Sequence, residues 1–202
     1  MNKKIFYIFL IIIIVLIVIS GGVLTYKNLG TTKEKSQLLN QPTNNTNNME
    51  TYKNSDYGFE IKYPSDWQKN EQVEGVVVAF LSPKKNASDT FQENLNILVQ
   101  DLSIFPFNQS MTLSEFTNLS VELIKQSIPD SKILESITVN LSGSQAYKVV
   151  FTGGQGQYNL KWMQIGIIKD NKAYIISYTA MADKYDGFLE TIQKMIDSFT
   201  II

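Results

Sequence analysis

Seven segments of this chain have the pattern of β-strands: in the first, apolar side chains alternate with others at a period of two, and the rest are strand-like apolar runs. The segments are residues 57–63, 76–81, 95–102, 132–139, 145–152, 159–168 and 172–180. Several of them are apolar on both faces, and a sheet built from such strands needs a covering layer on each side. We therefore expect other elements of the chain to lie against both faces of one sheet.

Two segments carry the helical period and supply this cover. Thr112 and Glu115 form a T-x-x-E capping box, and the apolar residues that follow recur at helical spacing until the chain reaches Pro129. A second helix is predicted near the carboxy terminus, where one apolar face runs from Phe188 to Phe199. The order of elements predicts an α+β fold, an antiparallel β-sheet of about six or seven strands sandwiched by helices.

Short turn sequences determine the connections between the last strands. GGQGQ at residues 153–157 is a glycine-rich loop, and Asp170-Asn171 is a two-residue turn. We expect the last three long strands to form an antiparallel meander. GGQGQ could also indicate a phosphate-binding loop, but the Gly-Lys-Ser/Thr ending is missing and a predicted strand flanks the loop on each side.

The amino terminus carries a long apolar run behind Lys3 and Lys4. The run extends from Ile5 to Ile19 without a break and continues to Tyr26, close to the ~20 residues that cross a bilayer. We expect residues 1–27 to be a transmembrane signal anchor of a single-pass membrane protein, with the carboxy-terminal part extracytoplasmic at the cell surface. A cleaved secretory signal, which would release the protein, is the alternative, but the small-x-small cleavage pattern is poor.

Residues 28–53 are polar, rich in Asn and Thr, and without a helical or strand period. A chain of this composition cannot bury enough apolar surface to become ordered. We therefore expect a disordered tether, followed by one folded domain at residues 54–202. From residue 50 onward the chain has 13 Lys against 18 acidic residues, a balance that argues against a nucleic-acid partner.

The composition excludes several kinds of chemistry. The chain has no His and no Cys, and every one of its 18 basic residues is Lys. Zinc sites of the usual kind, cysteine nucleophiles and Ser-His-Asp triads all need residues that are missing. We expect no catalytic residue, no cofactor and no enzymatic activity.

Two groups of acidic residues are the candidates for a site. Asp89, Glu93 and Asp101 flank one predicted strand and are weak candidates for calcium, which takes six to eight oxygen ligands. They lack the Asp-x-Asp-x-Asp-Gly pattern, and charges of this kind are more often solvated. Glu71 and Glu74 are candidates for a carboxylate-based hydrolase, but glycosidase carboxylates need a sugar-binding cleft.

An apolar loop and an aromatic run are candidates for contact surfaces. Phe105 and Phe107 precede the first predicted helix, where they either pack under it or contact a partner protein. The run YGFEIKYPSDWQK stops at Pro64, which has no N–H for a sheet ladder, and Trp67 is expected to close one end of the core. The serine in this run has no His to activate it, so the run marks the start of the domain and not an active site.

Four stretches, taken in order, resemble the PsbP-like proteins: YGFEIKYPSDWQK, FLSPKKNASDTFQENLNILVQDL, LSGSQAYKVVFT and YIISYTAMADKYDGFLETIQKMIDSF. The resemblance spans about residues 52–201. It implies an antiparallel sheet between helices and a non-enzymatic role, since PsbP is an extrinsic subunit that supports calcium and chloride retention at the oxygen-evolving centre. Metal proposals for plant PsbP involve a His, which this chain lacks. The anchor and the tether are similar to those of prokaryotic membrane-anchored PsbP-related proteins.

These observations predict a membrane-tethered, extracytoplasmic, non-catalytic domain that binds or helps to assemble a protein component of the cell envelope. A calcium or small-ligand binding module is one alternative, and a carboxylate-based surface hydrolase is another. Acidic side chains that converge in a cleft would favour one of the alternatives. A surface without converging acids would favour the binding domain.

Overall fold

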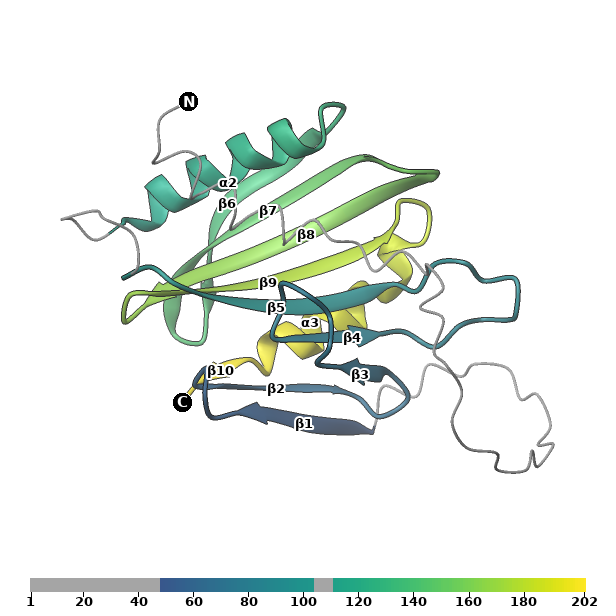
Figure 1. Ribbon diagram of the computed structural model, residues 1–202, viewed down its shortest axis with the longest axis horizontal. Helices are drawn as coiled ribbons and strands as arrows, with labels where there is room; N and C mark the ends of the chain where they lie inside the picture. Colours follow the sequence, from purple (N-terminus) through teal and green to yellow (C-terminus); the bar gives the residue numbers. More distant parts are fainter. Residues whose placement is uncertain (1–47, 104–110) are drawn as a thin grey trace.

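The computed structural model describes residues 48–103 and 111–202, and these residues form two antiparallel sheets with two α-helices and a short 3₁₀ helix (Figure 1). The strands are β1 (Met49–Asn54), β2 (Phe59–Pro64), β3 (Gln68–Asn70), β4 (Val78–Leu81), β5 (Asn94–Asp101), β6 (Lys132–Leu141), β7 (Ser144–Gln155), β8 (Tyr158–Lys169), β9 (Lys172–Met181) and β10 (Thr200–Ile201). The helices are α2 (Leu113–Ser127), the 3₁₀ helix η2 (Tyr185–Phe188) and α3 (Leu189–Asp197).

Seven strands form the large sheet, in the order β3-β4-β5-β9-β8-β7-β6. All six strands predicted from residue 76 onward lie in it, and the expected meander of the last three long strands is confirmed. GGQGQ is a hairpin, because Gln155 pairs with Tyr158 across a two-residue turn. The turn at Asp170 and Asn171 has φ values of 51° and 57°, the left-handed conformation that the tight turns of hairpins require.

Helix α2 begins where the capping box predicts. The Oγ1 atom of Thr112 accepts a hydrogen bond from the backbone N–H of Glu115 at 3.2 Å, and the Glu115 carboxylate accepts one from the backbone N–H of Thr112 at 2.9 Å. These bonds satisfy two of the amide groups that a helix start leaves without an internal partner. The helix ends at Ser127, before Pro129, as expected.

The two faces of the large sheet carry separate hydrophobic clusters. On the α3 face, the sheet packs against α3 and the small sheet through a largely aromatic core that includes Phe59, Phe80, Tyr178, Met195 and Phe199. On the α2 face, it packs against α2 through a cluster that includes Phe116, Tyr147, Phe151, Trp162 and Ile175. We use the names α2 face and α3 face for these two sides of the large sheet.

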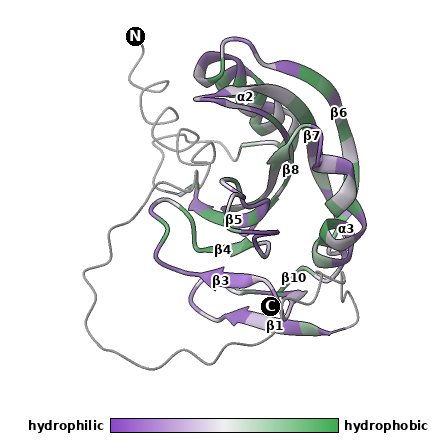
Figure 2. Ribbon diagram, turned by 90° about the vertical axis from the view of Figure 1, so that its right-hand side faces the viewer, coloured by the Kyte–Doolittle hydropathy of each residue, from purple (hydrophilic) through white to green (hydrophobic). Residues whose placement is uncertain are grey.

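The prediction of a single sheet covered only by helices is wrong in one respect. The first predicted strand, now β2, pairs with β1 and β10 in a separate three-stranded sheet, and this small sheet shares the cover of the α3 face with α3. Strand β1 is largely hydrophilic (Figure 2), so its sequence METYKN carries little strand signal. Only Tyr52 of this strand is buried. The sheet to which β2 belongs is determined by pairing with distant residues, which local sequence does not encode.

The folded domain begins earlier than residue 54, because β1 starts at Met49. This strand replaces the last residues of the expected tether. The predicted anchor at residues 1–27 and the remainder of the predicted tether lie outside the described residues. Within residues 48–103 and 111–202, no helix is both long enough and apolar enough to cross a membrane.

Candidate functional site

An open hollow of about 470 Å³ lies on the α3 face, between α3, η2 and strands β6, β7 and β8. We call it the α3 groove. Its lining combines an apolar floor with charged walls and consists of Glu135, Lys148, Val150, Lys161, Met163, Tyr185, Asp186, Leu189, Glu190 and Gln193. A hollow of this size is within the range that ligands and peptide side chains occupy.

Two ion pairs line the groove. Lys148 Nζ lies 3.2 Å from a carboxylate oxygen of Glu135, which joins β6 to β7. Lys161 Nζ lies 3.4 Å from Asp186 Oδ1, and it also lies 4.0 Å from the centre of the Tyr185 ring. Partly exposed pairs of this kind stabilise a fold by only ~0–1 kcal/mol, so a binding partner can replace them at low cost.

Tyr185 anchors the groove to the core. Its side chain is buried, and its ring packs 4.8 Å from the ring of Tyr178, whose hydroxyl donates a hydrogen bond to the Tyr185 carbonyl at 2.8 Å. Burial raises the pKa of Tyr185, and the nearby charges of Asp186 and Glu135 raise it further. The ring is therefore a neutral, fixed wall at neutral pH.

Strand β6 forms one rim of the groove and is also an edge of the large sheet. Among the described residues it pairs only with β7, so its outer backbone groups have no partner strand. Ile137 and Leu134 are 46% and 56% exposed, and the register shifts at Leu134, between Ile133 and Glu135. In natural proteins, edge strands are usually short or carry charged side chains. The strand at the opposite edge, β3, has only three residues. A ten-residue edge with exposed aliphatic side chains is typical of a protein-contact surface.

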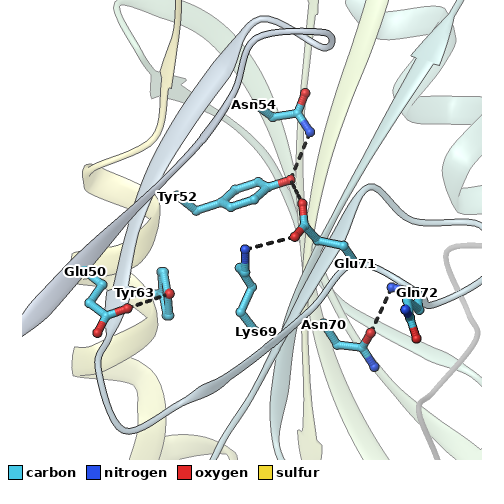
Figure 3. Close-up of polar contacts among 8 residues, drawn as sticks. All are labelled: Glu50, Tyr52, Asn54, Tyr63, Lys69, Asn70, Glu71 and Gln72. Carbon is cyan, nitrogen blue, oxygen red and sulfur yellow. Dashed lines mark hydrogen bonds and ion pairs between the residues drawn. The ribbon is translucent and has the colours of Figure 1, made fainter.

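Glu71, a candidate for hydrolase chemistry, belongs to a hydrogen-bonded network between β1 and the end of β3 (Figure 3). Its Oε1 atom accepts a hydrogen bond from the Tyr52 hydroxyl at 2.8 Å, and its Oε2 atom lies 2.9 Å from Lys69 Nζ. Tyr52 in turn accepts a bond from the Asn54 amide at 2.9 Å. The bonds from Lys69 and Tyr52 lower the pKa of Glu71, which makes it a poor general acid. Glu74 is exposed and takes no part in the network as Figure 3 draws it.

The tyrosines of this region connect the two sheets. Burial and the hydrogen bond that Tyr63 donates to Glu50 raise the pKa of Tyr63 to about 12. The ring of Tyr63 stacks on that of Phe80 at 4.6 Å, and the ring of Tyr52 packs edge-on against the same residue at 5.9 Å. The network thus attaches the small sheet to β4 and has the geometry of a structural joint.

Asp89 and Glu93 both feel the charge of Lys184, whose Nζ atom lies 3.7 Å from Asp89 Oδ1. Burial alone would raise the pKa of Asp89, but the backbone N–H of Lys85 and the charge of Lys184 outweigh it, so that its pKa is lowered. Glu93 is 1% exposed, and burial raises its pKa against the opposing charge of Lys184. Among the described side chains, only Ser82 donates a hydrogen bond to its carboxylate, and this bond is long, at 3.5 Å.

Asp101, the third calcium candidate, does not join this pair. It lies at the opposite end of the eight-residue strand β5, where Ser103 donates two hydrogen bonds to it, and these bonds lower its pKa. In the part of the chain that the structure describes, no three acidic side chains converge in a geometry that would hold a metal ion. Phe105 and Phe107, the predicted partner contacts, lie outside the described residues.

Several residues of the α3 groove were missed by the sequence analysis. Glu135 and Lys148 lie on the two arms of one hairpin, and a predicted turn at Ser142 and Gly143 would have brought them together. Lys161 and Asp186 come together only through the packing of η2 on β8, for which the sequence has no local signal. Trp67 is buried in the core of the α3 face, where its ring packs against that of Phe188 at 6.1 Å.

Comparison with known proteins identifies the relatives of this fold. A family model described as PsbP-like protein matches residues 7–201. The solution structure of cyanobacterial PsbP (CyanoP) from Synechocystis sp. PCC 6803 is similar, with a TM-score of 0.57 and 14% identity over 76% of this chain and 92% of that one. PA94 of Pseudomonas aeruginosa, a protein of unknown function, has a TM-score of 0.52 and 13% identity over 74% and 94%.

LpqN of Mycobacterium tuberculosis, described as involved in cell envelope biogenesis, has a TM-score of 0.54 and 9% identity, over 71% of this chain and 82% of that one. Identities of this size show a shared fold and nothing further about function. No curated protein matches the sequence.

Proposed function

The chain belongs to the PsbP-like protein family, and from that premise we propose that it is a membrane-tethered, extracytoplasmic, non-catalytic domain that binds a protein of the cell envelope. The partner docks an extended segment along β6 and inserts side chains into the α3 groove. The observation that carries this proposal is the coincidence of the groove with the free edge of β6.

The chemistry of this surface supports a protein partner. The unpaired backbone groups of β6 can add a strand, which is a common way to bind an extended peptide. Ile137 pairs with Lys148 across the hairpin, so its side chain lies on the same side of the sheet as the groove lining. Apolar side chains of a partner can therefore contact Ile137 and the groove floor together.

The residues around the groove support binding more than catalysis. Glu135 and Asp186 are each paired with a lysine. The chain contains no His or Cys that could act as a base or nucleophile. Envelope location rests on the sequence of residues 1–27, and the description of LpqN as involved in cell envelope biogenesis is compatible with it.

The test uses the full chain in its native membrane. After gentle crosslinking, the tagged protein is purified, and its co-purifying partners are quantified for the wild type and for the Ile137→Lys variant. A lysine at the centre of the contact would lose its hydration when the partner docks, and it would stand directly opposite the like charge of Lys148. We expect recovery of the partner to fall by at least about tenfold, equivalent to ~1.4 kcal/mol.

Tyr57→Lys is the matched control. Tyr57 is 41% exposed, close to the 46% of Ile137, but it lies in the turn between β1 and β2 of the small sheet. This variant should recover the partner as the wild type does. Equal recovery with Ile137→Lys, or the lack of any reproducible partner, would contradict the proposal.

A further inference from the structure

The hairpin of β6 and β7 determines which backbone groups of β6 are free. Leu141 pairs with Ser144 across a two-residue turn, and in such a hairpin the two residues that flank the turn exchange both backbone hydrogen bonds. Every second residue of β6, counted back from Leu141 to Glu135, therefore bonds to β7. The residues between them direct their N–H and C=O groups away from β7, to the free edge of the described sheet. These residues are Ser136, Thr138 and Asn140.

Three side chains of β6 lie on the α3 face beside the groove. Glu135 lines the groove, Ile137 is paired with Lys148 of the lining, and Val139 packs against the hydrophobic cluster of this face. All three belong to residues that bond to β7, so a strand added antiparallel to β6 would face them in non-hydrogen-bonded pairs. Side chains approach most closely in pairs of this kind, with Cα atoms about 4.5 Å apart. Each of the three therefore contacts the residue that a docked strand places opposite it.

The carboxylate is the more exposed member of each ion pair that a described groove residue forms. The side chain of Asp186 is 83% exposed and that of Lys161 23%. Glu190 is 80% exposed and its partner Lys194 43%, and Glu135 is likewise more exposed than Lys148. A carboxylate oxygen that already accepts one bond can accept another. A partner therefore meets mainly acceptors of negative charge here, and the excess of acidic residues from residue 50 onward also favours a basic partner.

On the basis of the proposed docking along β6, we infer that the docked segment of the partner has the sequence pattern apolar-x-apolar-x-basic. The segment runs antiparallel to β6, because antiparallel pairing is slightly more stable per residue than parallel pairing. Its two apolar residues lie opposite Val139 and Ile137, and its basic residue lies opposite Glu135. The residues marked x point to the other side of the sheet, where Ser136 and Thr138 are exposed, so polar residues suit them.

Each position of the pattern has a physical reason. Apolar side chains opposite Ile137 and Val139 remove exposed aliphatic surface from water when the segment docks. An arginine opposite Glu135 fits better than a lysine, because its planar guanidinium donates two parallel hydrogen bonds to a carboxylate. An acidic residue at this position would stand directly opposite a like charge, which destabilises a strand pair. Glu135 therefore selects the charge of the segment, and the two aliphatic residues select its apolar positions.

The test observes Met163, which lines the α3 groove. Full-length protein with carbon-13 methionine methyl groups, in nanodiscs of uncharged phosphatidylcholine, gives one NMR signal for Met163 and one for Met111, which packs on the α2 face. The variants Met163→Leu and Met111→Leu assign them. The probe is the synthetic peptide TVTVTRT, added at low ionic strength up to about 5 mM, a concentration that fills most of a site of millimolar affinity. We expect a saturable shift of the Met163 signal and no shift of the Met111 signal.

Two further peptides are matched controls. TVTVTET reverses the charge opposite Glu135 and should bind about tenfold more weakly, because repulsion replaces attraction. TVTVRTT keeps the composition and charge of the probe, but its arginine points to the other side of the added strand. It should bind about threefold more weakly, since the ion pair with Glu135 is lost. Equal binding of all three peptides would overturn the inferred pattern, while the docking of a strand along β6 would stand.

A pair of glutamate variants assigns the charge preference to one residue. Glu135→Gln removes the carboxylate beside the docked strand, and TVTVTRT and TVTVTET should then bind with affinities within about twofold of each other. Glu122→Gln makes the same change in net charge at an exposed position of α2, and the roughly tenfold preference for TVTVTRT should remain. A preference that persists in Glu135→Gln, or disappears in Glu122→Gln, would overturn the role of Glu135.

A lack of binding by all three peptides would also overturn the pattern, and so would equal shifts of the Met163 and Met111 signals. The proposed function is decided separately, by the recovery of a partner with the wild type and with Ile137→Lys. If the partner is lost with Ile137→Lys while no peptide binds, the surface is a docking site for a folded partner and not for a short extended segment. If peptides bind but no partner is recovered, the pattern stands and the proposed function fails.

Discussion

The two faces of the large sheet treat their polar atoms in opposite ways. On the α3 face, the hydroxyls of Tyr52, Tyr63, Tyr174 and Tyr178 each donate to a protein acceptor at 2.8 to 3.1 Å. On the α2 face, one buried polar atom in each of five residues has no hydrogen-bond partner among the described residues: Asn94, Asn96, Trp162, Gln164 and Ser177. Polar groups on the first face are explained by the fold, because they join the sheets and η2 to one another. Those on the second face have no such role, so replacing them with apolar groups should cost the fold less than on the first face.

The largest expected effect comes from the aromatic core of the α3 face. Phe59 is fully buried, and its ring packs against those of Tyr52 and Phe199 at 5.9 and 5.6 Å. Phe59→Ala should lower the free energy of unfolding by ~3–5 kcal/mol, because it removes this contact and leaves a cavity. Urea unfolding of the full-length chain, followed by near-UV circular dichroism, measures the loss.

Tyr57→Ala is the control for this prediction. Its side chain is exposed, and the free energy of unfolding should change by no more than ~0.5 kcal/mol. A loss below 1 kcal/mol for Phe59→Ala would show that the small sheet is not coupled to the large one through this cluster.

The α2 face is tightly packed where Tyr147 crosses β8. A Cβ atom added at Gly166 would collide with the Tyr147 ring, whereas one added at Gly187 would meet open space. Gly166→Ala should therefore destabilise the fold by ~1–3 kcal/mol through overpacking. Gly187→Ala should stay within ~0.5 kcal/mol. Equal stability of the two variants would contradict the close approach of Tyr147 to β8.

A matched pair of substitutions compares the two faces directly. Gln164→Met replaces a polar side chain whose amide nitrogen has no partner with an apolar one of similar size, and it should leave stability unchanged or raise it by ~1 kcal/mol. Tyr178→Phe deletes a buried hydrogen bond and should lower stability by ~1–2 kcal/mol. The comparison fails if both variants lose the same free energy of unfolding.

Glu93 is an exception on the α3 side, since its Oε1 atom is buried and unpaired. Burial raises its pKa above 4.5, so the folded state favours the protonated carboxyl. The raised pKa of Glu93 adds to the free energy of unfolding at low pH. This contribution is complete below the unfolded-state pKa and is lost as the pH rises through the folded-state pKa. Glu93→Gln should therefore gain stability relative to the wild type between pH 4 and pH 7. Parallel unfolding curves at the two pH values would contradict the shift.

Sequence patterns predicted the elements of this fold that depend on local signals. The Thr112 capping box, the Asp170-Asn171 turn and the alternation in the long strands each act over a few residues. The separate small sheet was missed because β1 is hydrophilic and β10 has only two residues. Its existence depends on pairing between residues 49–64 and residues 200–201, which no local pattern encodes.

The sites were harder to predict than the fold, because each is assembled across strands. Glu135, Lys161 and Asp186 are far apart in sequence and line one groove only through the pairing of the strands and the packing of η2 on β8. One signal was present: the turn at Ser142 and Gly143, which brings Glu135 and Lys148 together. Of the acidic candidates, Asp89 and Glu93 are brought together and Asp101 is not, because it lies at the other end of β5.

The central claim, that an envelope protein docks at the α3 groove and β6, is tested most directly by site-specific photocrosslinking in intact membranes. A photoreactive amino acid is placed at position 137 on β6 or, in a separate variant, at position 57 in the small sheet. The proposal predicts a discrete adduct of higher mass from position 137 and none from position 57. No adduct at position 137, or equal adducts at both positions, would contradict it.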